Sequence, residues 1–200
     1  MNIEVDEGNR NFADYDGALY DSECKKLIFV PKKATSIEFH PNTERILSEA
    51  FYLCSEIDSV TIPNSIKYIG KRAFAYSSLS TILFDEGGNS SLEIDVSAFE
   101  GTSITSLAIP IRTNNIKEKI LYNCKNLKHL TIPFIGKSYN ENDGEESSKF
   151  NHIFGIESMY SSYEYPTKLE EVKVLSGKIP AEAFYDWHGI KRIILPNEAT

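Results

Sequence analysis

The chain repeats one pattern of apolar residues with a period of 22 to 25 residues. Its clearest copy starts at Ile57 and reads I-x-x-V-x-I-P, then I-x-x-I-G, then A-F. The aromatic residue of the last pair, or a leucine in its place, recurs at intervals of 23, 25 and 22 residues, at Phe51, Phe74, Phe99 and Leu121. Self-similarity at such a period is the signature of a solenoid, in which each coil buries its apolar residues against the next.

The alternating apolar residues of each repeat predict a short β-strand. Val60 and Ile62 would point inward while Ser59 and Thr61 point outward, because successive strand residues face opposite sides. Seven such strands are expected to stack as a parallel sheet about 4.8 Å apart. The I-x-x-I and A-F segments would form the return side of each coil, without long helices. We expect one aromatic ladder between coils, formed by Phe51, Phe74, Phe99 and Phe184.

Two segments depart from the period. Residues 11–31 hold an Asp16-Gly17 turn signal between short apolar runs, which predicts a β-hairpin insert. Residues 136–166 predict an expanded repeat with loops, in which Ile153-Phe154 takes the A-F position. The whole chain, 1–200, is therefore expected to be a single solenoid. Since neither end shows a polar capping unit, we expect a fragment of a longer protein.

These residues resemble the BspA-type leucine-rich repeat proteins. The resemblance rests on the segment from Val60 to Phe74 and its echoes, on the Asp16–Pro31 hairpin and on the expanded repeat near Ile153. It implies a right-handed coil of the α/β repeat class, dominated by short parallel strands. It also implies secreted or surface-attached proteins of host-associated bacteria and some protozoan parasites, with no shared catalytic residues.

Two surfaces are candidate binding sites. The first is the outward side of the predicted concave sheet; an ordinary solvated sheet face is the alternative. The second is an aromatic loop cluster, because exposed aromatic residues anchor interfaces; the alternative is that they pack the insertion onto the coil. The candidate face comprises Ser59, Thr61, Thr81, Ser106, His129, Thr131, Glu171, Lys173 and Arg192, and the candidate loop contacts are Tyr160, Tyr163, Tyr165, Tyr185 and Trp187.

Composition and motifs argue against several other functions. A formal net charge of −8 disfavours nucleic-acid binding, and no apolar run is long enough to insert into a membrane. The acidic segment 140–146 lacks the first and last ligands of an EF-hand loop. Three cysteines without a CxxC spacing are expected to be small core fillers. The histidines are scattered over different coils. No cofactor or metal is therefore expected.

The sequence thus predicts a non-enzymatic binding or adhesion module. From the resemblance it would be extracellular or at a cell surface, although this chain begins without a signal peptide. Its partner would be a host or cell-surface protein or glycan. The alternatives are a structural spacer, or an accessory carbohydrate-binding region of a larger secreted protein.

Overall fold

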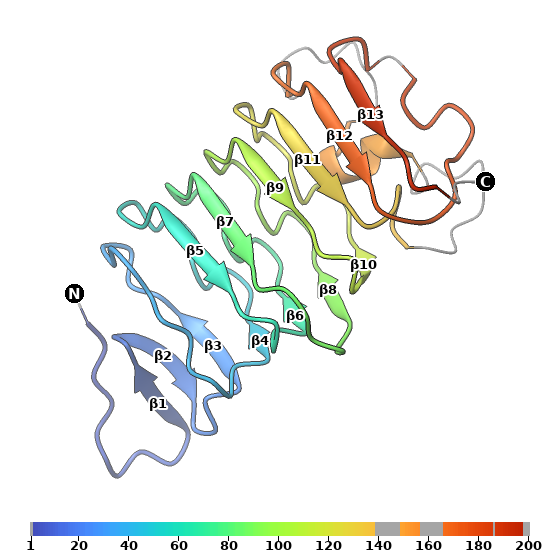
Figure 1. Cartoon of the computed structure of the whole chain (residues 1–200). Helices are drawn as coiled ribbons and strands as arrows, with labels where there is room; N and C mark the ends of the chain where they lie inside the picture. Colours follow the sequence, from blue (N-terminus) through green and yellow to red (C-terminus); the bar gives the residue numbers. More distant parts are fainter. Residues whose placement is uncertain (1, 139–148, 157–165, 186, 198–200) are drawn as a thin grey trace.

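The structure is a computed structural model that describes residues 2–138, 149–156, 166–185 and 187–197. It is an elongated solenoid of short strands, with the coils stacked from the N-terminal hairpin to β13 (Figure 1). The predicted repeat solenoid is confirmed. The described residues contain no α-helix; a 3-10 helix, η2 (Phe150–Phe154), lies in the expanded repeat.

In the described part of the chain, one side of the coils carries six parallel strands. Their order is interrupted once: β5 pairs with β7, and β9, β11, β12 and β13 form a second ladder. β7 and β9 pack side by side without ladder hydrogen bonds. The strands are β5 (Ser59–Ile62), β7 (Thr81–Phe84), β9 (Ser106–Ala108), β11 (His129–Ile132), β12 (Glu171–Val174) and β13 (Arg192–Ile194).

The seventh strand, expected around Ile37, does not form. Residues 35–39 follow the course of the coil without strand pairing. The backbone N–H of Glu38 donates to the Asp16 carboxylate at 2.6 Å. This bond joins the turn of the hairpin insert to the first coil.

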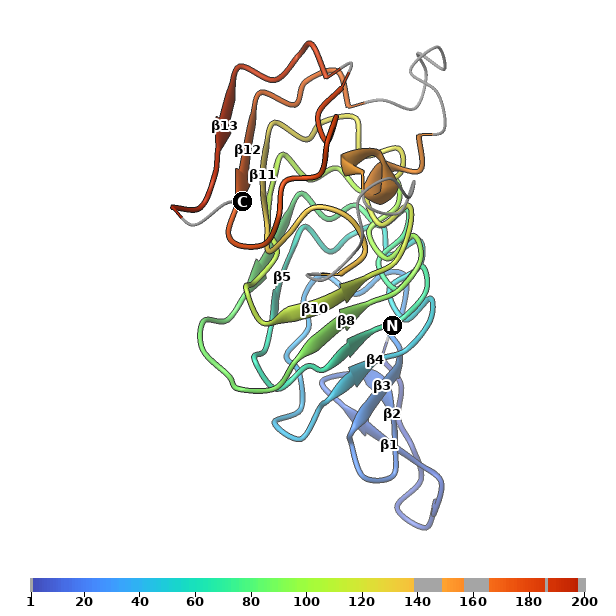
Figure 2. The ribbon, with the colours of Figure 1, turned by 90° about the vertical axis from the view of Figure 1, so that its right-hand side faces the viewer.

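A second sheet runs along another side of the coils, and Figure 2 shows it separate from the first. The Asp16-Gly17 turn joins β1 to β2 in the predicted antiparallel hairpin. β3 pairs antiparallel with β2 and parallel with β4, so the hairpin extends the sheet. β1, the outer strand of the hairpin, forms the N-terminal edge of this sheet. The strands are β1 (Phe12–Tyr15), β2 (Ala18–Asp21), β3 (Lys26–Phe29), β4 (Arg45–Ile46), β6 (Tyr68–Ile69), β8 (Leu92–Ile94) and β10 (Thr113–Ile116).

The core lies between the two sheets and the turns that follow them. Phe51 stacks on Phe74 at 4.6 Å between ring centroids, and Phe74 stacks on Phe99 at 5.6 Å. The ladder does not reach Phe184, contrary to expectation. Phe184 is only partly buried and packs against Phe150, which the expanded repeat contributes, at 5.0 Å.

Backbone hydrogen bonds join equivalent positions of successive coils. The N–H of Phe51 donates to the Ala73 carbonyl, and that of Phe74 donates to the Ala98 carbonyl. In the same way Leu121 donates to the Ile153 carbonyl at 2.9 Å. Ile153-Phe154 therefore takes the A-F position, as the sequence predicts.

At five of these repeat positions the residue two places before the aromatic residue, or before Leu121, adopts a left-handed backbone; in the expanded repeat the 3-10 helix η2 takes this place. These residues have φ between 54° and 63°, although a side chain makes this conformation unfavourable. Their recurrence at one repeat position indicates that the turn between the sheets requires it. They are Glu49, Arg72, Ser97, Lys119 and Glu182.

The cysteines are expected to differ in reactivity. Cys54 and Cys124 are buried, and burial raises the pKa of each thiol to about 11. Cys24 is partly exposed. Burial and the nearby Asp21 also raise the pKa of Cys24. At pH 8 Ellman's reagent should therefore modify Cys24 faster than the other two, which should react only after unfolding, because the thiolate is the nucleophile and Cys24 is the accessible thiol. Equal rates for all three thiols in the folded protein would contradict the packing.

The same pKa values set a pH dependence of stability. The folded pKa of about 11 for Cys54 lies above the ordinary 9.0 of an unburied thiol. Its burial therefore favours the folded state below pH 9. This contribution is lost as the pH rises from 9 to 11, since the thiolate prefers the unfolded chain.

Candidate functional site

The strand register arranges the C-terminal members of the candidate face in two rows. His129 pairs with Glu171, and Glu171 pairs with Arg192, on the adjacent strands β11, β12 and β13. Ser106 on β9 continues this row. Thr131 and Lys173 form a second row with Ile194. Because side chains alternate along each strand and these strands pair in register, the side chains of both rows lie on one surface.

Side chains of this face remain available to solvent. His129, Lys173 and Arg192 are exposed, and Glu171 is half-buried. Arg192 Nη1 lies 3.2 Å from a Glu171 carboxylate oxygen. Such exposed pairs contribute little to stability, so the charges on this face are not needed to hold the fold.

The first part of the face, on β5 and β7, is separated from the second by the break in the ladder. Ser59 pairs with Thr81, and Thr61 pairs with Leu83. Leu83 is 56% exposed. The predicted continuous panel is therefore present as two hydrogen-bonded parts. The outward residues of β5, β7 and β9 are uncharged, and the charges lie on β11, β12 and β13.

A row of charged residues lies directly before β11, β12 and β13 and was not among the predicted site residues. The N–H of Glu170 donates to the Lys128 carbonyl at 2.9 Å, and that of Lys191 donates to the Glu170 carbonyl at 2.8 Å. Lys191 Nζ lies 3.1 Å from the Glu170 carboxylate and holds the pKa of that carboxyl below its usual value. The repeat pattern could have identified these three residues, because each directly follows the inward leucine or isoleucine that opens the strand motif.

The aromatic cluster is only partly described. Tyr160, Tyr163 and Tyr165 lie outside the described residues. Tyr185 is 68% exposed, consistent with an accessible side chain. Trp187 requires a correction: it is 5% exposed, and its Nε1 donates to Asn151 Oδ1 at 2.7 Å. It is therefore a core residue and not an exposed contact.

The burial of Trp187 predicts its fluorescence. It is the single tryptophan of the chain and packs against the rings of Phe150 and Phe154. We expect emission at shorter wavelength than in the unfolded chain and weak quenching by acrylamide. Quenching as strong as that of free tryptophan would show that the ring is on the surface.

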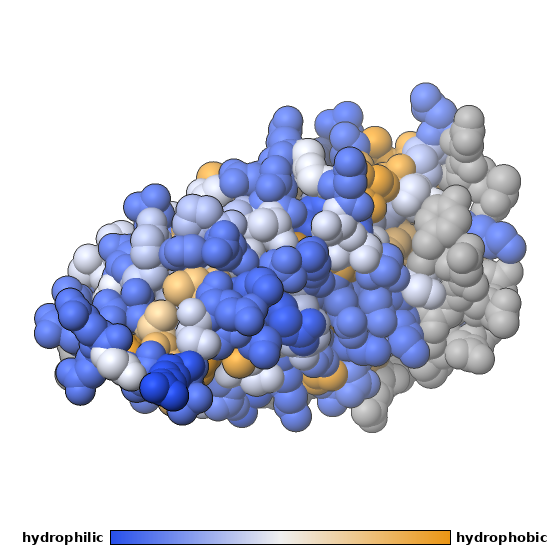
Figure 3. Space-filling view, turned by 90° about the horizontal axis from the view of Figure 1, so that it is seen from below, coloured by the Kyte–Doolittle hydropathy of each residue, from blue (hydrophilic) through white to orange (hydrophobic). Residues whose placement is uncertain are grey.

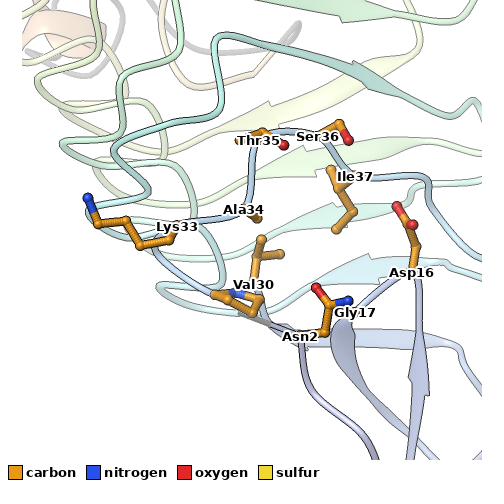
Figure 4. A pocket seen from close by; sticks show the side chains of 10 residues that line it. Asn2, Asp16, Gly17, Val30, Lys33, Ala34, Thr35, Ser36 and Ile37 are labelled. Atoms are coloured by element: carbon orange, nitrogen blue, oxygen red, sulfur yellow. The ribbon is translucent and has the colours of Figure 1, made fainter.

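A cavity of about 340 Å³ lies between the N-terminal segment and the first coil (Figure 4). Asp16, at its mouth, already accepts the Glu38 N–H. Lys33 extends away from the cavity and pairs with Glu56 at 2.6 Å. The polar groups best suited to hold a ligand are thus engaged in the fold. The cavity is lined by Asn2, Asp16, Gly17, Val30, Pro31, Lys33, Ala34, Thr35, Ser36 and Ile37.

The surface seen from below is mostly hydrophilic, with small separate hydrophobic patches (Figure 3). Among residues whose positions are described, no three His, Cys, Asp or Glu side chains converge as metal ligands. The acidic segment 140–146 falls outside the described part of the chain. Within the described ranges no helix is long and apolar enough to cross a bilayer.

The chain belongs to the family of the BspA type leucine rich repeat region. Six copies of the repeat match the family model over residues 22–142. The curated proteins contain no match to this chain. Neither the family nor the solved structures that match it indicate a catalytic function.

Solved structures share the fold at low sequence identity. The pneumococcal vaccine antigen PcpA is 22% identical, with a TM-score of 0.66, over 98% of this chain and 50% of that chain. A leucine rich cell surface protein from Faecalibacterium prausnitzii is 23% identical, with a TM-score of 0.52, over 98% and 41%. The T. pallidum leucine rich repeat protein TpLRR is 17% identical, with a TM-score of 0.56, over 98% and 84%. The chain thus spans about half the length of the first of these relatives.

Proposed function

We propose that this chain is a non-enzymatic binding module that presents the outward side of β9, β11, β12 and β13 to a partner at a cell surface. The row formed by His129, Glu171 and Arg192 carries the proposal. These side chains lie in register on a rigid sheet, and their charges are not required by the core. A surface of fixed side chains loses little conformational entropy on binding.

The family supports a location outside the cell. One matching structure is described as that of a leucine rich cell surface protein and another as that of a vaccine antigen. These descriptions belong to those proteins, and here they support an extracellular or surface location for this chain. The partner we propose is a protein or a glycan of a host or of another cell.

The proposal is tested on an array of matrix proteins and glycans. The variant His129→Ala/Glu171→Ala/Arg192→Ala should lose at least about tenfold in affinity for whichever ligand the wild type binds, or about 1.4 kcal/mol. Its thermal melting should be nearly unchanged, since exposed charges contribute little to stability.

A matched control changes exposed residues of the second sheet and its turns. The variant Lys26→Ala/Lys71→Ala/Glu118→Ala should bind as the wild type does, because these exposed side chains lie away from the candidate face. Unchanged binding by the first variant would contradict the proposed face. Absence of any ligand on a broad array would favour a structural spacer instead.

A further inference from the structure

Charge is distributed unequally along the six strands of the binding face. Three repeat positions point outward or border this face: the residue before each strand and its two outward residues. In the coils of β5, β7 and β9 these positions hold one charged residue, Asp58. In the coils of β11, β12 and β13 they hold four lysine or arginine residues and two glutamates: Lys128, Lys173, Lys191, Arg192, Glu170 and Glu171.

This end of an acidic protein is therefore locally basic. The net charge of the whole chain is −8, yet cations outnumber carboxylates on this part of the face. Lys128 and Lys173 are both exposed. At physiological ionic strength charges are screened beyond about 8 Å, so a ligand on the face is governed by these nearby cations more than by the net charge.

The order of the charges is regular. Lys128, Glu170 and Lys191 follow one another on adjacent coils, as the backbone hydrogen bonds between them require. On the strands themselves Glu171 and Arg192 repeat the carboxylate and the cation, with His129 in the remaining place of the row. Since neighbouring strands are about 4.8 Å apart, Lys128 and Lys191 leave the backbone about 10 Å apart, with Glu170 between them.

We propose that this face binds an acidic polysaccharide that carries one acidic group on every second sugar; the proposal rests on the binding function proposed above. Lys128 and Lys191 would pair with the acidic groups, at a spacing on the scale of a disaccharide. To do so Lys191 would give up its exposed ion pair with Glu170, as Arg192 would give up its pair with Glu171. Between them the carboxylates of Glu170 and Glu171 would accept hydrogen bonds from sugar hydroxyls.

The same order disfavours other polyanions. In a nucleic acid or an acidic peptide every unit carries a negative charge, so Glu170 and Glu171 would face like charges. The rows also lack the buried aromatic anchors typical of interfaces between folded proteins. A polymer with alternating acidic and hydroxyl-bearing units satisfies both kinds of side chain.

The experiment measures binding to immobilised hyaluronan, which has one carboxylate on every second sugar. The wild type should bind with an affinity that falls as salt is added, and should not bind carboxyl-reduced hyaluronan. The variant Lys128→Glu/Lys173→Glu should bind at least about tenfold more weakly, because two attractive contacts become repulsive. The control Arg10→Glu/Lys71→Glu has the same net charge change at exposed sites elsewhere and should bind as the wild type does.

Several results would overturn the inference. These are equal weakening by the two double variants, equal binding to the carboxyl-reduced polymer, or tighter binding to polyglutamate or duplex DNA than to hyaluronan. Failure to bind hyaluronan would also overturn it. The proposed function would stand in that case if the variant of His129, Glu171 and Arg192 had lost another ligand on the array.

Discussion

Replacing Phe74 with alanine is expected to lower the free energy of unfolding by about 3–5 kcal/mol. Phe74 is fully buried and stacks on Phe51 on one side and on Phe99 on the other. The change removes a ring that contacts the coils on both sides, and the coils can close the resulting cavity only by bending the backbone. The coil-to-coil hydrogen bond from Phe74 to Ala98 limits such collapse.

Urea denaturation followed by Trp187 fluorescence measures the Phe74→Ala effect. The control is Phe12→Ala, because Phe12 is 44% exposed on the edge strand β1. That variant should cost less than about 1 kcal/mol. Similar losses for the two variants would contradict the aromatic ladder as a principal contributor to stability.

Replacing Gly70 with alanine is expected to cost about 3 kcal/mol, a large effect for one methyl group. A Cβ atom at this position would lie 2.6 Å from the Ser48 backbone nitrogen and 2.7 Å from the Leu47 carbonyl carbon. Both are main-chain atoms of the preceding coil, so no side-chain rotation relieves the contact. The two coils must move apart, which weakens the hydrogen bond from Gly70 to the Ile46 carbonyl.

Gly8→Ala is the matched control for this substitution. A Cβ atom on Gly8 would meet no atom within 4 Å. Circular dichroism during thermal unfolding should show a clear fall in the melting temperature for Gly70→Ala and almost none for Gly8→Ala. Equal melting temperatures for the two variants would contradict the close approach of the two coils at Gly70.

The repeat period made the inward residues of each coil predictable. Val60 and Ile62 are buried and Ser59 and Thr61 exposed, because alternation in a strand fixes the sides once one residue is known to face the core. The same logic could have predicted that Trp187 is buried. It occupies the repeat position of the buried Cys54, but its aromatic character suggested a binding role.

Other features had no local signal in the sequence. The left-handed turns use Glu49 and Arg72, residue types with no preference for that backbone. β4 and β6 are two residues long, too short for periodicity to reveal. Arg112 donates to the Ile66 carbonyl at 2.7 Å, a contact across 46 residues. Such features follow from stacking of the coils and not from the sequence of any one coil.

The candidate face was predicted in its strand positions but not in its charge order. Alternation identified His129, Glu171 and Arg192 as outward residues. Their alignment in one row follows from the register of three strands. Because the expanded repeat lies between β11 and β12, this register is indicated by equal repeat positions and not by a constant spacing in the sequence. Lys128 and Lys191 join the face because the coils bond to one another just before the strands.

Lysine footprinting tests the binding face most directly. The folded protein is acetylated with and without saturating hyaluronan, and the modified lysines are identified by mass spectrometry. We predict that Lys128, Lys173 and Lys191 are protected by the polymer, while Lys26 and Lys71 react as in the free protein. Equal protection of all five lysines, or protection of Lys26 and Lys71 alone, would contradict the assignment of the β11–β13 face as the binding surface.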